Sequence, residues 1–153
     1  MSFTVAIQTE DFDVQHEVAQ LRSGDARVGA VCVFLGTVRE RNDGSAVSSM
    51  ELEHYPGMTE RALEKIAREA CARWPLTACT VIHRYGRLVP GDPIVLVLTA
   101  SAHRVAALES CAFLIDWLKT KAPFWKREEF AGGEARWVEA KAEDDIAAAR
   151  WAQ

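Results

Sequence analysis

The sequence predicts an α+β fold in which helices cover one face of a mainly antiparallel sheet. Short runs rich in β-branched residues occur in pairs joined by turn residues, which is typical of hairpins. Between these pairs lie longer segments whose apolar residues recur every three or four positions, which is typical of amphipathic helices. No internal repeat, linker or low-complexity segment interrupts this order, so residues 1–153 are predicted to form one domain.

The first half of the chain is predicted to alternate strands with helices. The expected strands cover residues 3–9, 28–40 and 47–55, and the expected helices cover residues 14–21 and 58–74. The turn signal Asn42-Asp43-Gly44 joins the second and third strands as a hairpin. Gly24 ends the first helix, and Pro75 closes the second because proline cannot continue a helix.

The second half repeats this arrangement. Strands are expected at residues 78–86, 93–101, 124–130 and 135–140, and helices at 102–119 and 143–151. Pro90-Gly91-Asp92 and Gly132-Gly133 are the turns of two hairpins. Ser101 has the side chain of a good N-cap, so it is expected to begin the long helix.

Composition and charge exclude several classes of protein. The chain is 49% hydrophobic and 26% charged, as in ordinary globular proteins, and its net charge of −4 argues against a general nucleic-acid binder. The start MSFTVAIQTEDF has no basic segment followed by an apolar one, so no signal peptide is expected. No apolar run approaches the ~20 residues needed to span a bilayer, and the protein is predicted to be cytoplasmic, without a membrane partner.

The four cysteines are predicted to be reduced, buried thiols. Cys32, Cys71, Cys79 and Cys111 are widely spaced, with no CxxC pair and no histidine at zinc-like spacing. Neither a metal site nor a bound cofactor is therefore expected. His54 and His83 lie within predicted strands among apolar neighbours, where a structural role is the simpler interpretation.

Two groups of basic residues could bind an anion. His103 and Arg104 open a predicted helix, where basic side chains oppose the helix dipole but would suit a phosphate at the free N–H groups. The alternative is an exposed arginine that reaches away from the helix end. Arg39 and Arg41 follow a strand that contains Gly36, which leaves room for a bulge or for a ligand. A solvated sheet rim explains this pair equally well.

The stretch KTKAPFWKRE, residues 119–128, combines cations with an aromatic corner. Lys119 ends a predicted helix, where a cation complements the dipole. Lys126 has no such explanation. It lies in a predicted strand next to Trp125, and strand alternation sends these two side chains to opposite faces, with Trp125 taken as the core residue. Lys126 is therefore expected to face solvent or a cleft, whereas Lys121 is expected to be solvated.

Six short motifs along the chain match one known family in their order and spacing. They are FLGTVR (34–39), EHYPGM (53–58), HRYGRL (83–88), AHR (102–104), DWLK (116–119) and PFWKRE (123–128). Together they resemble the large (catalytic) subunit of molybdopterin synthase. The resemblance extends from Val5 to Trp151, and it implies an α/β hammerhead fold with a small additional antiparallel sheet.

The resemblance also implies an activity and a set of partners. The enzyme would convert cyclic pyranopterin monophosphate (precursor Z) into molybdopterin by installing two sulfurs as a dithiolene. The sulfur donor would be the C-terminal Gly-Gly thiocarboxylate of a small ubiquitin-like subunit, whose tail enters a pocket of the large subunit. The family assembly is a heterotetramer, in which a dimer of large subunits carries one small subunit at each end.

Site residues follow from the same resemblance, position by position. Lys119 and Lys126 would be the catalytic pair beside the thiocarboxylate. The implied substrate-binding residues are Thr37, Val38, Arg39, His103, Arg104, Arg127 and Glu128. Lys141 stands where the family pattern suggests arginine, and a lysine keeps the charge but loses bidentate phosphate geometry. Phe124 stands where the family often has a branched aliphatic residue.

Helix geometry makes this site incompatible with one copy of the chain. His103 and Lys119 are 16 residues apart on one predicted helix, which separates them by about 24 Å at 1.5 Å per residue. Both can contact one small pterin only if His103 and Arg104 come from a second copy. The sequence therefore predicts a homodimer with two shared sites.

Two other functions are consistent with parts of the sequence. A non-catalytic module that binds small anions would explain the arginines and a dimer, but not the need for both lysines. A sulfurtransferase that uses its own cysteine persulfide would need an activated thiol. All four cysteines lie in apolar segments, and no basic residue directly adjoins any of them in sequence, which argues against that alternative.

Overall fold

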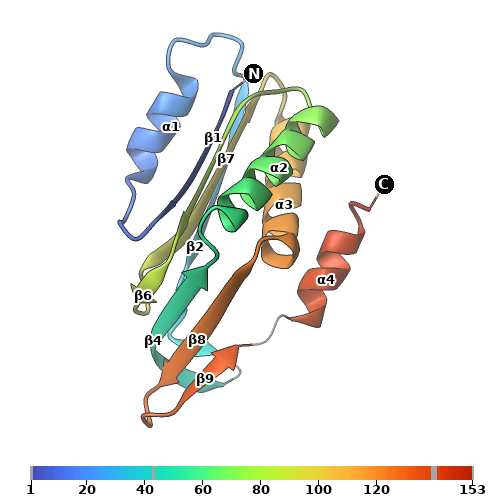
Figure 1. Ribbon diagram of the computed structural model, residues 1–153. Helices are drawn as coiled ribbons and strands as arrows, with labels where there is room; N and C mark the ends of the chain where they lie inside the picture. The colour runs from blue at the N-terminus through green and yellow to red at the C-terminus, as the bar shows by residue number, and fades with distance from the viewer. Residues whose placement is uncertain (1, 43, 139–140, 153) are drawn as a thin grey trace.

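The computed structural model describes residues 2–42, 44–138 and 141–152, which form two sheets and four helices (Figure 1). The strands are β1 Ser2–Gln8, β2 Ala30–Thr37, β3 Arg41–Asn42, β4 Ser45–His54, β5 Leu76–Arg84, β6 Gly86–Leu88, β7 Pro93–Ser101, β8 Phe124–Phe130 and β9 Ala135–Val138. The helices are α1 Val14–Arg22, α2 Met58–Arg73, α3 Arg104–Lys121 and α4 Ala142–Ala149. No helix in the described ranges combines the length and apolar character needed to cross a bilayer.

The two sheets confirm the predicted α+β class with a small additional antiparallel sheet. The first sheet has the order β1-β5-β7-β2, with β1 parallel to β5 and the other pairs antiparallel. The second has the order β3-β4-β8-β9, and β6 also pairs with β4, all antiparallel. The hairpins expected from β5 with β7 and from β8 with β9 are both present.

The hairpin predicted from residues 28–40 and 47–55 is wrong. β2 pairs with β7, whereas β4 pairs with β8 in the other sheet. The chain leaves the first sheet at Val38, whose N–H donates to the carbonyl of Asp92. The turn signal instead closes the two-residue strand β3 onto β4, and its Asp43 lies outside the described residues. Residues 139 and 140 of the predicted last strand also lie outside them.

Helices cover both faces of the first sheet, which corrects the prediction that they lie on one face. α2 and α3 pack on one face, where Leu63 and Phe113 meet Val97 in the main core. On the opposite face, residues of α1 pack against Leu96 and Leu98 (Figure 1). Successive side chains of the central strand β7 are fully buried toward both faces, so each face needs a cover.

The long helix α3 begins two residues later than predicted. His103 is its N-cap, whereas the expected cap Ser101 is buried and its hydroxyl donates to the carbonyl of Pro75 at 2.8 Å. Lys119 lies in the last turn of α3. His103 and Arg104 therefore lie at the opposite end of α3 from Lys119.

Trp151 anchors the C-terminal segment against α2 and α3. Its ring meets Trp74 and Phe113 edge to face, with centroids 5.5 and 5.9 Å away. The indole N–H donates to Asp116 at 2.8 Å, and Arg73 donates to the Trp151 carbonyl at 2.6 Å. This anchoring fixes the short helix α4 beside α3, with the start of α4 directed toward the second sheet (Figure 1).

Candidate active site

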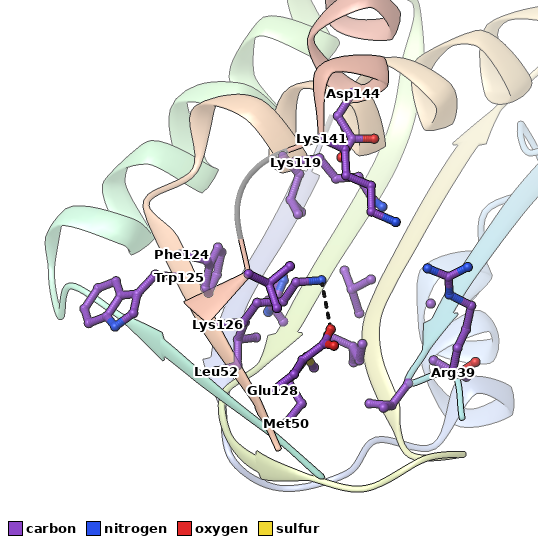
Figure 2. Close-up of a pocket in the computed structure, with 18 of the residues that line it drawn as sticks. Arg39, Met50, Leu52, Lys119, Phe124, Trp125, Lys126, Glu128, Lys141 and Asp144 are labelled. Carbon is purple, nitrogen blue, oxygen red and sulfur yellow. Dashed lines mark ion pairs between the residues drawn. The ribbon is translucent and has the colours of Figure 1, made fainter. Parts of the chain in front are cut away.

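A pocket of about 390 Å³ lies where the end of β2, the second sheet, the last turn of α3 and the start of α4 meet (Figure 2). This volume is within the range of sites that bind small organic ligands. Five cationic side chains contribute to its wall: Arg39, Arg41, Lys119, Lys126 and Lys141. Its acidic members are Glu128 and Asp144, and apolar residues such as Met50, Leu52 and Phe124 complete it.

Strand β8 directs Lys126 into this pocket, as its alternation predicts. The Lys126 ammonium lies 3.9 Å from the carboxylate of Glu128, two residues along the same strand (Figure 2). Trp125 points the other way, and its ring lies against Tyr55 with centroids 4.5 Å apart. Strand β8 pairs with β4 on one side and with β9 on the other, so it holds the Lys126 cation at the pocket within a sheet.

The electrostatic surroundings of Lys126 weaken its hold on a proton. Burial is the main cause that lowers the pKa of Lys126 below that of an ordinary lysine. The Glu128 carboxylate opposes this change, whereas the positive charges of Lys119, Lys141 and Arg39 add to it. Lys126 therefore gives up its proton more readily than a surface lysine does.

Replacing Glu128 with glutamine is expected to lower the pKa of Lys126 further, because the variant removes the negative charge that favours the ammonium. The expected change is about one pH unit to lower pH. It can be measured as the pH midpoint of acylation at Lys126, mapped by mass spectrometry. Glu134→Gln, in the exposed β8–β9 turn, is the matched control. An unchanged midpoint in Glu128→Gln would contradict this electrostatic description.

Thr37 at the end of β2 and the next two residues, Val38 and Arg39, belong to the wall. The pairing of β2 with β7 shifts register between Gly36 and Thr37, which is the irregularity that Gly36 suggested. A Cβ on Gly36 would lie 2.7 Å from the Val95 side chain, so only glycine fits without a shift. Arg39 follows β2 by two residues and lies across the pocket from Lys126 and Lys141 (Figure 2).

Three of the residues implied by the resemblance are absent from the pocket wall in the described part of the chain. His103 and Arg104 are exposed at the far end of α3. Arg127 is exposed on the opposite face of β8 from Lys126. The pocket of one copy therefore unites Thr37, Val38, Arg39, Lys119, Lys126 and Glu128 but not these three.

The sequence left the role of Lys141 undecided, and it did not predict that Asp144 and His83 line the pocket. Lys141 does line the pocket, because the anchored helix α4 begins beside it. Asp144 lies one turn further on and carried no signal, since acidic residues are common in a first helical turn. His83 was expected to be structural, and it is buried in the wall with its ring stacked on Phe124. His54 packs on Tyr85, with its Nε2 3.5 Å from Glu60.

The cysteines are free thiols, and none of them is among the residues that line the pocket in the described ranges. A hydrogen bond with Cys71 raises the pKa of the Cys79 thiol, and burial raises that of Cys111. The same hydrogen bond lowers the pKa of Cys71. Within the described ranges no cluster of three or more His, Cys, Asp or Glu side chains could hold a metal ion.

Comparison with known proteins identifies the family. The family described as "MoaE protein" matches residues 7–121. A protein of Ralstonia nicotianae named "Molybdopterin synthase catalytic subunit" is 55% identical over 148 residues, which cover 97% of this chain and 84% of that protein. A Burkholderia ambifaria structure titled "Molybdopterin biosynthesis MoaE protein" has a TM-score of 0.84 and 53% identity, with 100% of this chain and 99% of that chain covered.

A more distant structure agrees with this fold. The crystal structure titled "Molybdopterin Synthase from Staphylococcus aureus" has a TM-score of 0.80 and 31% identity, and covers 87% of this chain and 95% of that chain. The resemblance drawn from the six motifs is confirmed by these matches. With a family match over three quarters of its length and relatives more than 50% identical over nearly all of it, this chain belongs to the MoaE protein family.

Proposed function

We propose that this protein is the catalytic subunit of molybdopterin synthase, which converts cyclic pyranopterin monophosphate into molybdopterin. The observation that carries the proposal is the convergence of Lys119, Lys126 and Arg39 on one pocket of ligand size. A relative that is 55% identical over 97% of this chain bears the same name. As implied by the resemblance, the enzyme transfers two sulfurs, one at a time, from thiocarboxylated small subunits.

The pocket supplies what this chemistry needs from the protein. Negative charge develops as the thiocarboxylate sulfur attacks the pterin and as the small subunit later leaves with its carboxylate. The ammonium groups of Lys119 and Lys126, which both line the pocket, stabilise that charge. The lowered pKa of Lys126 also suits it to pass a proton during the reaction. Arg39 binds the substrate beside the backbone of Thr37 and Val38, and Glu128 holds Lys126 in position.

The substrate phosphate is proposed to bind His103 and Arg104 of a second copy. Within one copy these residues lie at the opposite end of α3 from Lys119. Exposed apolar side chains support a covering partner: Val105 and Leu108 on α3 are 58% and 57% exposed, next to His103 and Arg104. Val33 and Leu35 on the edge strand β2 are also exposed. Such apolar surface is typical of an interface between copies. Arg127 remains a proposed substrate ligand that faces away from the pocket of its own copy.

The proposed assembly is a homodimer of this chain that binds one small ubiquitin-like subunit per pocket, giving a heterotetramer. Residues 1–153 act as one catalytic-subunit domain in this proposal. The protein works in the cytoplasm, needs no metal or bound cofactor of its own, and has no nucleic-acid or membrane partner. A cysteine-based sulfurtransfer is disfavoured, because the pocket is lined by lysines rather than thiols.

The test is a mixing assay with purified wild-type protein, precursor Z and a thiocarboxylated small subunit, in which the dithiolene product is detected. The expected result is product that requires all three components. No product despite a donor that is active with a known large subunit would overturn the proposal. A pocket that binds the pterin phosphate without converting it would then favour the anion-binding module.

A further inference from the structure

His83 is a buried imidazole in the pocket wall that the proposed sulfur transfer does not use. It lies near the end of β5, is 5% exposed and lines the same pocket as Lys119 and Lys126. Its ring stacks on Phe124 with centroids 3.9 Å apart and an interplanar angle of 19°. The stacking fixes the plane of the imidazole, so its nitrogen atoms have set directions.

The backbone determines which nitrogen of His83 carries the hydrogen. Nδ1 lies 2.8 Å from the carbonyl oxygen of Arg84. Because a carbonyl oxygen can only accept, Nδ1 must donate, and the neutral ring then has a lone pair on Nε2. Burial lowers the pKa of His83 to about 4, with nearby His54 adding to the effect against the Arg84 carbonyl. The ring is therefore neutral at physiological pH.

The lone pair on Nε2 is open to the pocket. Across the described part of the chain, the Arg84 carbonyl is the one hydrogen-bond partner of the His83 ring. His54 Nδ1 is fully buried and has no hydrogen-bond partner. His83 Nε2 is not among the atoms that are buried in this way. Since the residue is almost fully buried and lines the pocket, the pocket is the space that Nε2 reaches.

His83 Nε2 is an uncharged acceptor in a wall that is rich in cationic side chains. The cations Arg39, Arg41, Lys119, Lys126 and Lys141 are hydrogen-bond donors with no acceptor. The wall also contains the carboxyl groups of Glu128 and Asp144, and Glu128 lies beside Lys126. A phosphate has only acceptors to offer near neutral pH and would be repelled by a lone pair, whereas the N–H groups of a heterocycle fit it. The His83 region therefore selects the ring of a substrate over its phosphate.

We propose that His83 Nε2 accepts a hydrogen bond from an N–H of the bound pterin and so orients the ring relative to the lysines. This inference rests on the proposed function, since it assigns a role at the same site. It makes His83 a specificity-determining residue that binds substrate and takes no part in sulfur transfer. The amide N–H of the small subunit's tail is a second possible donor of the same chemistry, so binding must be measured without that subunit.

Two amide replacements separate the two nitrogens of His83. In His83→Asn the side-chain amide ends near the position of Nδ1, where it can still donate to the Arg84 carbonyl, but no acceptor reaches the pocket. In His83→Gln the amide reaches the position of Nε2 and can accept there, while the Arg84 contact is lost. A purely structural histidine would tolerate asparagine better, whereas a substrate acceptor would tolerate glutamine better.

The experiment is a titration of wild type, His83→Asn and His83→Gln with precursor Z alone, accompanied by thermal unfolding and by kcat and KM with the small subunit. His83→Asn is expected to weaken pterin binding roughly 10-fold, the effect of one lost hydrogen bond, and to raise KM more than it lowers kcat. His83→Gln is expected to stay within about 3-fold of wild type. Unchanged binding by His83→Asn, or weaker binding by His83→Gln than by His83→Asn, would overturn the inference.

A measurement on the wild type does not depend on variants that fold. With ¹⁵N-labelled histidine, the Nε2 resonance of His83 should shift on saturation with precursor Z in the direction of a hydrogen-bonded acceptor. No shift at saturation would contradict the proposal. Turnover by the same wild-type sample reports separately on the proposed function. An active wild type with an unaffected His83 would reject this inference alone.

Discussion

Lys126→Ala is expected to lower the rate of product formation by roughly 100-fold or more, with the protein still folded. The alanine removes a cation that strand β8 holds in the pocket, where negative charge would develop in the proposed reaction. Lys119→Ala is expected to have an effect of similar size, because Lys119 lines the same pocket from α3. Single-turnover rates at saturating precursor Z and small subunit would measure both effects.

Lys121→Ala is the matched control for these variants. Lys121 belongs to the same basic stretch, but its ammonium lies 4.7 Å from the Trp117 ring centre and it is exposed, apart from the pocket wall. Its removal is expected to leave the rate near that of wild type. Circular dichroism would establish that all variants are folded. A Lys126→Ala enzyme that keeps its rate within a few fold would contradict the catalytic role of this lysine.

Mixing two inactive variants is expected to restore activity if each site is built from two copies. Arg104→Ala removes a proposed phosphate ligand, and Lys126→Ala removes a proposed catalytic lysine. Each homodimer of one variant therefore has two defective sites. A mixed dimer has one site with both defects and one intact site. With random exchange of subunits, about a quarter of all sites would be intact. The rate of a mixture after exchange, compared with each variant alone, measures the recovery.

A second mixture makes this test specific. Lys119→Ala and Lys126→Ala damage the same pocket of the same copy, so every site in their mixed dimers keeps one defect and no recovery is expected. Exchange can be verified with differently tagged chains. If exchange occurs but the Arg104→Ala and Lys126→Ala mixture stays inactive, then Arg104 does not contribute to the partner's site and the shared-site prediction is wrong.

Local features of the fold were well predicted because they depend on neighbours in sequence. Alternation along β8 separates Lys126 from Trp125, and the structure has them on opposite faces. The helix that contains His103 and Lys119 has the expected length to within two residues at each end. These patterns reflect backbone geometry that one segment determines by itself.

Strand pairing between distant segments was harder to predict. A turn signal after residue 40 favours a hairpin, but it cannot reveal that β2 has a better partner in β7, whose side chains are buried on both faces. The same double burial explains why α1 lies opposite α2 and α3. A fully apolar strand shows no alternation of polar and apolar residues, so its sequence carries no information on which face of the sheet is covered.

Parts of the site were hidden for a similar reason. A buried histidine in an apolar strand looks the same in sequence whether its free nitrogen faces the core or a cavity, so His83 was assigned a structural role. The position of Lys141 depends on Trp151, which anchors the following helix through Asp116 and Arg73. Such contacts join residues far apart in the chain, and no local pattern marks them.

The length of α3 sets the distance between two sites if its two ends contribute to different pockets. In the proposed dimer, the 18-residue helix would act as a spacer between two reaction centres, with the proposed phosphate ligands at one end and Lys119 at the other. Insertion of a single turn would lengthen it by about 5.4 Å and misalign both centres of the dimer at once. Surface loops can change length with little consequence, but in the proposed homodimer every change in the length of this helix occurs in both copies and alters both sites.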